Sequence, residues 1–365
     1  MLSIIIPTFN EVENIIPLIE SLISVINNFE YEIIVIDDDS PDGTSDVINN
    51  YMSKNDKVKL ITRIDRSGLS SAIKEGLIFA RGDYLLVLDG DGQHDPTCIR
   101  SILNKISEDH TDLVIASRFL KSSQMKGLSG KRSFGSRIAN YAARISLNKN
   151  YINLTDYLSG CFCLRKKSTK SLFRKIEING FKFLFELLSV SKGRLLVKEV
   201  PLLFKKRLYG NSKLDIAIIW DFLVSILHNF SFRILPRRAI SFGLVGLSGI
   251  CVQFLLVSIL TKVLLIGFYK ALPFAVVGAA SSNFLINNLL TFRFNKLKNL
   301  SLLFGYLKFL LVASLPIIAN IGITTSFYNY VTKDTFVAQM AGIVIVYAWN
   351  YLASSSFIWN KSISN

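Results

Sequence analysis

The chain is poor in the residues that hold structural metals and form disulfide bonds. It has three histidines and four cysteines among 365 residues, and its closest cysteine pair, Cys161 and Cys163, is separated by one residue rather than two. No second pair stands at the spacing of a zinc site, so the sequence predicts no structural zinc centre. We interpret the cysteines as small buried residues of a protein in a reducing compartment.

The N-terminal segment lacks the features of a secretory signal. Its first apolar run, Ser3 to Pro7, has no basic residue before it and is too short for a signal-peptide core. We therefore expect the first domain to stay in the cytoplasm.

The chain also lacks a recognisable nucleic-acid-binding motif, although its formal net charge is +15.

Charge and hydropathy are unevenly distributed. Half of the residues are hydrophobic and the mean hydropathy is +0.38. Charged residues are frequent up to about Leu235, whereas long apolar runs dominate beyond Ala239. This division makes an anionic membrane surface, or phosphate-bearing lipids and nucleotides, the expected partner of the positive charge, and not nucleic acid.

The apolar run Leu85–Leu88 ends in acidic residues. Such a run is typical of a buried parallel strand, and open α/β sheets place their ligands at the carboxyl ends of these strands. Asp89, Asp91 and Gln93 follow at that end. Two carboxylates and an amide offer hard oxygen ligands for Mg²⁺ or Mn²⁺, especially for an ion shared with substrate phosphates. An ordinary acidic turn is the alternative interpretation.

Strands and helices alternate through this half of the chain. The expected strands cover residues 3–7, 31–36, 58–61 and 85–88, with helical periodicity between them. The alternation favours an α/β fold with a doubly wound, mostly parallel sheet.

Four motifs stand in order along these elements. They are Ile4-Ile-Ile-Pro7-Thr-Phe-Asn-Glu11, Asp37-Asp-Asp-Ser-Pro-Asp-Gly-Thr44, Gly68-Leu-Ser-Ser-Ala72 and Asp89-Gly-Asp91-Gly-Gln93-His94. Together they resemble the nucleotide-sugar-binding half of inverting family-two glycosyltransferases and, more narrowly, polyprenyl-phosphate (dolichol-phosphate) mannose synthases. The resemblance implies a GT-A fold, which is a Rossmann-like α/β domain with a mostly parallel sheet.

The resemblance also implies roles for residues at matching positions. The donor nucleotide sugar would be bound by Pro7, Phe9, Glu11, Asp38, Asp89, Gly90, Asp91, Arg207 and Lys213. The metal ion, Mg²⁺ or Mn²⁺, would be held by Asp91, Gln93 and Asp89. The acceptor phosphate would meet Arg118, Arg132 and Ser136. The chemistry of transfer would depend on Asp91, Arg118, Arg207 and Lys213.

The expected helix around Glu186 departs from the pattern of some relatives. Those that glycosylate sugar hydroxyls place a catalytic carboxylate there and follow it with an Arg-Trp pair, which this chain lacks. A phosphate acceptor is ionised at neutral pH and needs no general base. We therefore interpret Glu186 as a residue that orients basic neighbours, with a catalytic base as the alternative, and His94 as a structural residue at a helix start.

The second half predicts four membrane-spanning helices. Its apolar stretches, 239–266, 271–292, 304–330 and 336–359, each reach the length of about 20 residues that a spanning helix needs. The preceding segment is interrupted by charges and is expected to lie at the membrane interface, with burial in the globular core as the alternative. The expected domains are a cytoplasmic GT-A domain (1–213), interfacial amphipathic helices (214–238) and a membrane domain (239–360).

Basic residues indicate the orientation of these spans. They precede the first span, lie between the second and third and follow the fourth: Arg233, Arg237, Arg238, Arg293, Lys296, Lys298 and Lys361. This bias predicts an integral membrane protein with both termini in the cytoplasm, in the plasma (inner) membrane if the source is prokaryotic.

The second and fourth spans contain an internal repeat. Ser282–Phe292 resembles Trp349–Trp359, because Asn, an aromatic residue and Leu lead each copy and an aromatic residue closes it. Two such hairpins form a parallel repeat, and the pattern is similar to a GtrA-like membrane domain. We interpret the intramembrane asparagines as interhelical hydrogen-bonding residues, with a transport or lipid-flipping role as the alternative: Asn283, Asn287, Asn288 and Asn350.

These observations lead to one functional hypothesis and two alternatives. The hypothesis is transfer of mannose from GDP-mannose to a polyprenyl (dolichyl-type) phosphate with inversion, which gives a β-linked product. The first alternative keeps this chemistry but uses a UDP-sugar as the donor of glucose or an N-acetylhexosamine. In the second, the protein is a non-catalytic scaffold for translocating lipid-linked sugars.

Overall fold

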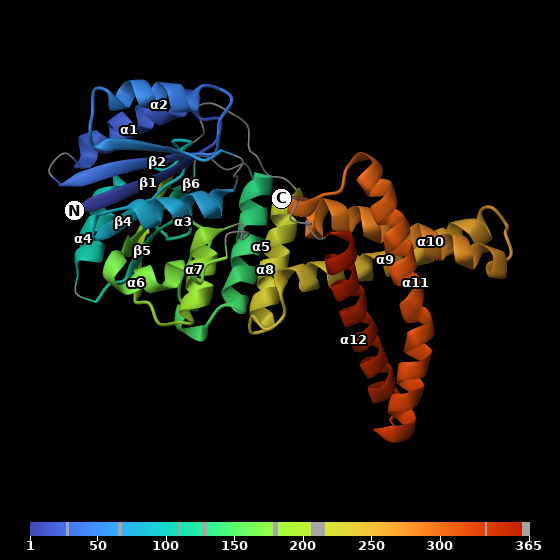
Figure 1. Cartoon of the computed structure of the whole chain (residues 1–365). Helices are drawn as coiled ribbons and strands as arrows, with labels where there is room; N and C mark the ends of the chain where they lie inside the picture. Colours follow the sequence, from blue (N-terminus) through green and yellow to red (C-terminus); the bar gives the residue numbers. More distant parts are fainter. Residues whose placement is uncertain are drawn as a thin grey trace. The chain divides into compact units, whose positions relative to one another are not determined.

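The computed structural model describes residues 1–26, 29–64, 68–108, 110–125, 130–177, 182–205, 216–332 and 334–359. It divides the chain into two compact units, Met1–Phe230 and Ser231–Asn365. Each unit has its own hydrophobic core. Figure 1 shows strands and helices in the first unit and helices in the second.

A seven-stranded sheet with the order β3-β2-β1-β4-β7-β5-β8 forms the centre of the first unit. Its strands are β1 (Leu2–Thr8), β2 (Tyr31–Asp37), β3 (Val58–Thr62), β4 (Tyr84–Val87), β5 (Leu113–Ser117), β7 (Phe162–Arg165) and β8 (Val197–Pro201). Only β7 runs antiparallel to its neighbours in this sheet. A short parallel pair, β6 (Gln124–Met125) and β9 (Leu203–Phe204), lies apart from it. The predicted mostly parallel α/β sheet is confirmed.

Helices cover both faces of this sheet. They are α1 (Val12–Ile26), α2 (Thr44–Met52), α3 (Leu69–Phe79), α4 (Cys98–Ser107), α5 (Gly130–Ser146), α6 (Lys166–Phe173), α7 (Phe183–Ser191) and α8 (Ile216–Phe230). Because successive side chains of a strand point to opposite faces, Ile4 and Ile6 join the core beneath α1 and α4, and Ile5 joins the core beneath α3 and α7. Burial on both faces explains why every residue of β1 and β2 is buried.

The cysteines divide between the two units. Cys98, Cys161 and Cys163 are buried in the core beneath α1 and α4, as predicted. Cys251 is exposed on α9 (Arg237–Lys262) of the second unit, so the prediction of burial is wrong for it. Its helix is apolar around much of its circumference, and a cysteine on such a surface is compatible with lipid contact.

The carboxyl ends of β1, β2, β4 and β5, which the predicted site residues follow, lie at the same edge of the sheet. β1 pairs in parallel with β2 on one side and with β4 on the other, and β5 runs in the same direction as β4 because both are antiparallel to β7. The strand order therefore reverses at β1: β2 and β3 follow on one side of it, and β4 begins the other side. Such a switch point opens a crevice beyond the carboxyl ends of the strands, where open α/β sheets bind their ligands.

Helix α8 lies in the segment expected at the membrane interface. Phe222 and Ile226 pack against the core of the first unit. The side chains of Ile216, Ile219 and Leu223 remain exposed by 73%, 60% and 41%. One apolar face of this helix is thus covered by protein, and a second apolar face is open.

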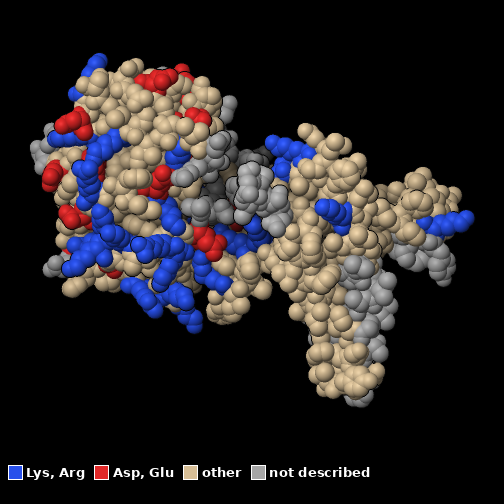
Figure 2. All heavy atoms as spheres, in the orientation of Figure 1, with Lys and Arg blue, Asp and Glu red and all other residues tan. Residues whose placement is uncertain are grey.

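The second unit consists of α9, α10 (Phe268–Ile286), α11 (Asn299–Tyr330) and α12 (Thr335–Ala353). Over the described residues, Arg237–Lys262 and Pro273–Thr291 are long and apolar enough to cross a membrane, and Asn299–Ser314 and Val344–Ile358 form shorter apolar helical segments. Figure 2 shows Lys and Arg gathered on the first unit, while the visible face of the second unit carries few charges. The predicted apolar helical domain is present.

The internal repeat is visible in the backbone of this unit. α10 and α12 each end in a π-helical segment, and these segments begin at Asn287 and Ser354, an offset of 67 residues. The aromatic residues that close the two copies, Phe292 and Trp359, have the same offset and stack with ring centroids 4.3 Å apart. The repeat is therefore structural as well as sequential.

The intramembrane asparagines do not share one role. Asn288 accepts from Leu297 N at 2.8 Å and from Trp359 Nε1 at 3.1 Å, and it donates to Leu297 O, as expected of an interhelical link. The Oδ1 atoms of Asn283, Asn287 and Asn350 are buried without a hydrogen-bond partner. The predicted interhelical hydrogen bonds are wrong for these three residues, because their side chains face a cavity between the helices.

A buried carboxylate gives the first unit a testable pH dependence. Glu32 is 2% exposed and accepts from Ser3 Oγ, Lys59 Nζ and Arg81 N. Burial raises the pKa of Glu32, but these hydrogen bonds outweigh burial and hold the pKa below its ordinary 4.5. The contribution of Glu32 to stability is therefore present above pH 4.5 and is lost as the pH falls through the lower folded-state pKa.

We expect Glu32→Gln to flatten this part of the acid-unfolding profile and to lower the melting temperature at neutral pH. The measurement is thermal unfolding between pH 3 and 7 with Glu20→Gln, an exposed acid on α1, as the control. An unchanged pH profile in Glu32→Gln would contradict the assignment.

Candidate active site

The loop after β4 carries the two carboxylates predicted to bind metal. Asp91 is 8% exposed, and its Oδ1 accepts from Gln93 N at 3.1 Å. Gln93 Nε2 donates to Lys205 O at 3.1 Å, which fixes the amide and leaves Oε1 as its ligand atom. His94 Nδ1 accepts from Asp89 N at 3.3 Å, so the buried imidazole braces this loop. His94 lies ahead of α4 and not at its start, since α4 begins at Cys98.

These residues fit a metal ion that is shared with a substrate. Among the described residues, no group of three His, Cys, Asp or Glu side chains could enclose an ion. Asp89 and Asp91 with the Gln93 amide offer three hard oxygen donors on one short loop. Mg²⁺ and Mn²⁺ suit such sets, in which waters and phosphate oxygens complete the coordination.

Two glycines allow backbone segments to close around the carboxylates. A Cβ on Gly90 would lie 2.9 Å from Thr8 Cγ2 and 3.2 Å from Pro7 O, so the β4 loop touches the end of β1. A Cβ on Gly160 would lie 2.2 Å from Asp89 Oδ2. The Ser159–Gly160 turn therefore packs directly against the Asp89 carboxylate, and a residue larger than glycine would not fit at position 160.

Asp38, at the end of β2, is tied into a buried network that the sequence did not reveal. Its Oδ1 accepts from Arg63 Nε at 2.7 Å and its Oδ2 from Gly68 N at 2.8 Å. Burial raises the pKa of Asp38, while the hydrogen bond from Gly68 and the charge of Arg63 oppose that rise. Arg63 is 3% exposed and precedes the Gly68 motif along the chain. It links the second and third motifs in space.

The loop after β1 supplies the other predicted donor-binding residues. Pro7 is buried within β1, and the Phe9 ring is 43% exposed just beyond the strand. Glu11 Oε2 accepts from Asn14 Nδ2, and Glu11 N donates to Thr44 Oγ1 at the start of α2. The ends of β1 and β2 are thus joined into one rim, on which Phe9 offers an aromatic surface.

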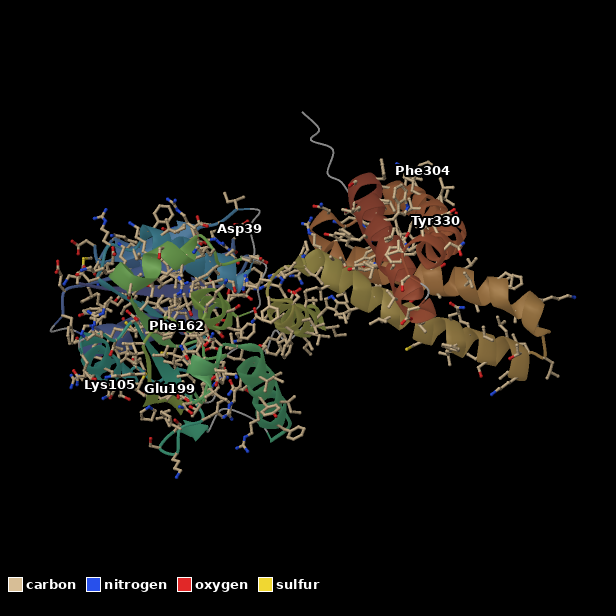
Figure 3. The ribbon with its side chains drawn as sticks, turned by 90° about the horizontal axis from the view of Figure 1, so that it is seen from below. Asp39, Lys105, Phe162, Glu199, Phe304 and Tyr330 are labelled. Atoms are coloured by element: carbon tan, nitrogen blue, oxygen red, sulfur yellow. The ribbon has the colours of Figure 1, made fainter. Side chains whose placement is uncertain are left out.

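Arg118, at the end of β5, is held by a two-pronged ion pair. Its Nε and Nη2 donate to the two oxygens of Asp156 at 2.7 and 2.9 Å. Glu199, labelled on β8 in Figure 3, accepts in turn from Thr155 N and Asp156 N. Burial raises the pKa of Glu199 despite these hydrogen bonds. The chain of contacts from Glu199 to Arg118 fixes the guanidinium in orientation.

A pocket of about 520 Å³ lies beside Arg118. Arg137 and Arg144 of α5 line it together with Arg118, and the sequence analysis did not select either of them. They are seven residues apart and hence on one face of the helix, which is the signal that could have found them. Asn140, between them, bonds Tyr157 N and Thr155 O and so ties α5 to the Asp156 turn.

The remaining predicted residues divide as follows. Ser136 is described on α5 but is not among the described residues that line the arginine pocket. The side chain of Arg132 lies outside the description. Arg207 and Lys213 lie in 206–215, outside the described residues.

Lys182 is a further charged residue that the sequence analysis missed. It occupies the N-cap position of α7, whose first residue, Phe183, stacks on Phe162 at 6.0 Å (Phe162 is labelled in Figure 3). Burial lowers the pKa of Lys182, although the nearby charges of Asp89 and Asp156 favour its protonated form. The charge of Arg118 lowers this pKa further, so Lys182 lies within the electrostatic range of both the carboxylates and the Arg118 guanidinium. Glu186, one turn further along α7, is 1% exposed.

The first unit is an α/β domain whose predicted site residues follow the strands at the switch point between β1 and β4. Comparison with known proteins identifies its family. The family described as "Glycosyl transferase family 2" matches residues 3–173, and the family "GtrA/DPMS, transmembrane domain" matches residues 241–359.

Individual proteins are similar to this chain over different shares of its length. A dolichol-phosphate mannosyltransferase of Pyrococcus furiosus is 32% identical over 363 residues, which cover 98% of this chain and 99% of that protein. The dolichol-phosphate mannosyltransferase of Saccharomyces cerevisiae is 29% identical over 66% of this chain and 91% of its own length. A crystal structure of glucosyl-3-phosphoglycerate synthase from Mycobacterium tuberculosis with Mn²⁺, UDP and glucosyl-3-phosphoglycerate is 18% identical, with a TM-score of 0.47 over 63% of this chain and 79% of that one.

The full-length relationship confirms the resemblance drawn from the four motifs. The chain belongs to the family-two glycosyltransferases and, among them, to the dolichol-phosphate mannosyltransferases, and its second half matches the GtrA/DPMS transmembrane domain.

Gly160 provides a direct test of the site geometry. Gly160→Ala places a methyl group within the space of the Asp89 carboxylate, so we expect Asp89 to be displaced and glycosyl transfer to fall by about 10²-fold, the usual effect of a misplacement near 1 Å. The measurement is kcat with the fold monitored by circular dichroism. Gly267→Ala is the matched control, because a Cβ there meets nothing within 4 Å. Equal rates in the two variants would contradict the proposed contact.

Proposed function

We propose that this protein transfers mannose from GDP-mannose to a dolichyl-type polyprenyl phosphate with inversion, giving a polyprenyl β-phosphomannose. The observation that carries the proposal is the 32% identity to a dolichol-phosphate mannosyltransferase across 98% of the chain, which includes both units. The geometry of the described residues in the first unit supports the donor and acceptor sites.

The crevice at the β1–β4 switch point is the proposed donor site. Phe9 offers its exposed ring to the nucleobase, and Asp38, which Arg63 and Gly68 hold in place, faces the ribose side. Asp89, Asp91 and Gln93 would hold Mg²⁺ or Mn²⁺ on the diphosphate. When bound, this ion neutralises charge on the leaving nucleotide. Arg207 and Lys213 are proposed to add positive charge at the same diphosphate.

The arginine-lined pocket is the proposed site of the acceptor phosphate. Arg118 is oriented by Asp156, and Arg137 and Arg144 add two guanidinium groups that match phosphate oxygens in geometry. Arg132 and Ser136 of α5 remain proposed contributors. α5 also carries a stripe of exposed apolar side chains at helical spacing: Phe134, Ile138, Tyr141 and Ile145. A phosphate site below an apolar helix face suits a lipid whose phosphate lies at the membrane surface.

The chemistry requires little proton transfer. An ionised oxygen of the lipid phosphate attacks C1 of mannose as the bond from C1 to the GDP β-phosphate oxygen breaks, and attack from the opposite face inverts the anomeric centre. Because the attacking oxygen carries its negative charge already, no general base is needed. Glu186 then acts by orienting charged neighbours, among which Lys182 lies on the same helix end. Arg207 and Lys213, with Lys182 nearby, stabilise the negative charge that shifts to GDP.

The membrane arrangement is part of the proposal. The interfacial segment, including α8, lies at the cytoplasmic surface, and the four helices of the second unit cross the membrane with both termini in the cytoplasm. The exposed apolar face of α8 supports contact with that surface. Transfer of the sugar to the lipid on the cytoplasmic side agrees with a nucleotide sugar as the donor.

A transfer assay tests the donor and the metal site. Purified protein in detergent receives labelled GDP-mannose, UDP-glucose or UDP-N-acetylglucosamine with polyprenyl phosphate and Mg²⁺ or Mn²⁺. We expect chloroform-extractable label from GDP-mannose, and a loss of at least 10³-fold in Asp91→Asn, since the ion and its stabilisation of the leaving group are lost together. Asp39→Asn is the matched control, because Asp39 is an exposed acid at the same edge (Figure 3).

Each other outcome has a defined meaning. Label from a UDP-sugar would overturn the choice of donor and keep the reaction. Near-normal transfer by Asp91→Asn would overturn the metal site. Absence of lipid-bound label with every donor would overturn the enzymatic proposal.

The arginine pocket predicts a separation between acceptor and donor binding. We expect Arg137→Gln and Arg144→Gln each to raise the KM for polyprenyl phosphate by about 10- to 100-fold, the equivalent of one charge-assisted hydrogen bond, with little change in the KM for GDP-mannose. Arg194→Gln, an exposed arginine of the same unit, is the control. Equal increases in both KM values would instead indicate a general loss of structure.

A further inference from the structure

The second unit contains a half-open cavity of about 350 Å³. All four of its helices contribute to the wall, through Phe242 of α9, Asn283 of α10, Phe309 of α11 and Asn350 of α12. Ligand pockets in proteins start at about 300 Å³, so the cavity has the size of a small headgroup rather than of a whole lipid.

Polar atoms without partners line this cavity. The Oδ1 atoms of Asn283, Asn287 and Asn350 and the Oγ of Ser354 are buried and make no hydrogen bond. Asn287 and Ser354 are each only 1% exposed. A buried polar group left without a hydrogen bond is destabilising, and an apolar surrounding such as lipid offers no partner for it. Four such atoms at one cavity indicate a missing partner that supplies hydrogen-bond donors.

These four residues form two pairs related by the internal repeat. Asn283 corresponds to Asn350 and Asn287 to Ser354, both at the offset of 67 residues. The aromatic residues Phe242 and Phe309 in the wall have the same offset. The cavity is thus built twice from equivalent positions. An accidental packing defect has no reason to repeat in this way.

Asn288 shows how a structural amide is treated in the same unit. It stands next to Asn287, yet both of its amide atoms are satisfied by hydrogen bonds from or to Leu297 and Trp359. The cavity amides also have little room to turn elsewhere, since a Cβ on Gly249 of α9 would lie 2.5 Å from the Asn283 amide. The second unit can thus provide hydrogen-bond partners for an amide such as Asn288, but it provides none for the amide oxygens of Asn283, Asn287 and Asn350, which line the cavity.

The wall also indicates the chemistry of the occupant. None of the described residues that line the cavity is Asp, Glu, Lys, Arg or His, which disfavours an ionised group. Amide oxygens accept hydrogen bonds from hydroxyl groups, and Phe242, Phe309 and Tyr347 offer apolar faces. Amides combined with aromatic surfaces suit a neutral group that carries several hydroxyls and also has an apolar C–H face.

We propose that this cavity is a second binding site, which takes a neutral polyhydroxylated headgroup, of the glycosyl class, through the amides of Asn283, Asn287 and Asn350 and the hydroxyl of Ser354. The site lies wholly in the second unit and is separate from the donor and acceptor sites. Only the choice of mannose as the probe sugar rests on the proposed function.

Binding of an alkyl mannoside to the full-length protein tests the site. The protein is purified in an amine-oxide detergent, which carries no sugar, and octyl β-D-mannoside is added. We expect saturation-transfer NMR signals from the sugar ring protons, and a loss of affinity of about tenfold or more in Asn287→Leu and Asn350→Leu. Ser248→Ala on α9, which lies outside the cavity wall, is the control that should bind like the wild type.

Thermal unfolding without the mannoside distinguishes a ligand site from a structural one. Asn287→Leu and Asn350→Leu should keep or raise the melting temperature, because each replaces an unsatisfied amide by an apolar group. Asn288→Leu should lower it, since that change breaks three hydrogen bonds. A fall in melting temperature in all three variants would overturn the proposal in favour of structural amides.

The remaining outcomes are equally decisive. Equal binding of octyl tetraethylene glycol ether, which has the same alkyl chain and no sugar ring, would overturn the proposal, as would the absence of mannoside signals in the wild type. Asp91→Asn, which disables the proposed reaction, should retain the mannoside signal. Failure of the transfer reaction and failure of this site are therefore observed separately.

Discussion

Backbone segments at the edge of the first sheet approach one another more closely than side chains would permit, and the proposed active site depends on that approach. Gly90 brings the β4 loop against Pro7 and Thr8 of β1, while Gly160 brings the turn before β7 against the Asp89 carboxylate. The strand order makes these contacts possible, because β1 and β4 are parallel neighbours at the switch point. Packing thus fixes the Asp89 carboxylate at this edge, where the proposed metal and diphosphate would bind.

Charged residues around this crevice are held by partners rather than left to solvent. Arg63 and Gly68 hold Asp38, and Asp156 holds Arg118 with Glu199 behind it. Removal of charges from water is costly, and it is tolerated when each charge is paired and hydrogen-bonded. A group that must bind phosphate in the correct orientation gains from such pairing, since less motion has to be lost on binding. The pairing that offsets the cost of removing these charges from water is therefore the same pairing that orients the phosphate-binding group.

The second unit follows a different constraint. In hydrocarbon every polar group needs an internal partner, so the polar residues of these helices are informative. The Phe292–Trp359 stack and the hydrogen bond from Trp359 to Asn288 join the two copies of the repeat, and the bonds with Leu297 complete the pairing of the Asn288 amide. The paired residues around the cavity depart from this rule in both copies. The same fold therefore contains amides that stabilise it and amides directed at a cavity.

The sequence by itself determined the alternation of strands and helices, the mostly parallel sheet, the apolar second half and the four motifs, because hydrophobic periodicity and turn residues are local signals. It also pointed to Asp38, Asp89, Asp91 and Arg118, each of which follows a strand. Tertiary structure alone decided that Arg63 pairs with Asp38, that Arg137 and Arg144 join Arg118, and that Lys182 lies among the carboxylates. It also separated Asn288 from the asparagines that face the cavity. These residues stand on different elements, and their side chains acquire partners only when the sheet, α5 and the membrane helices pack together.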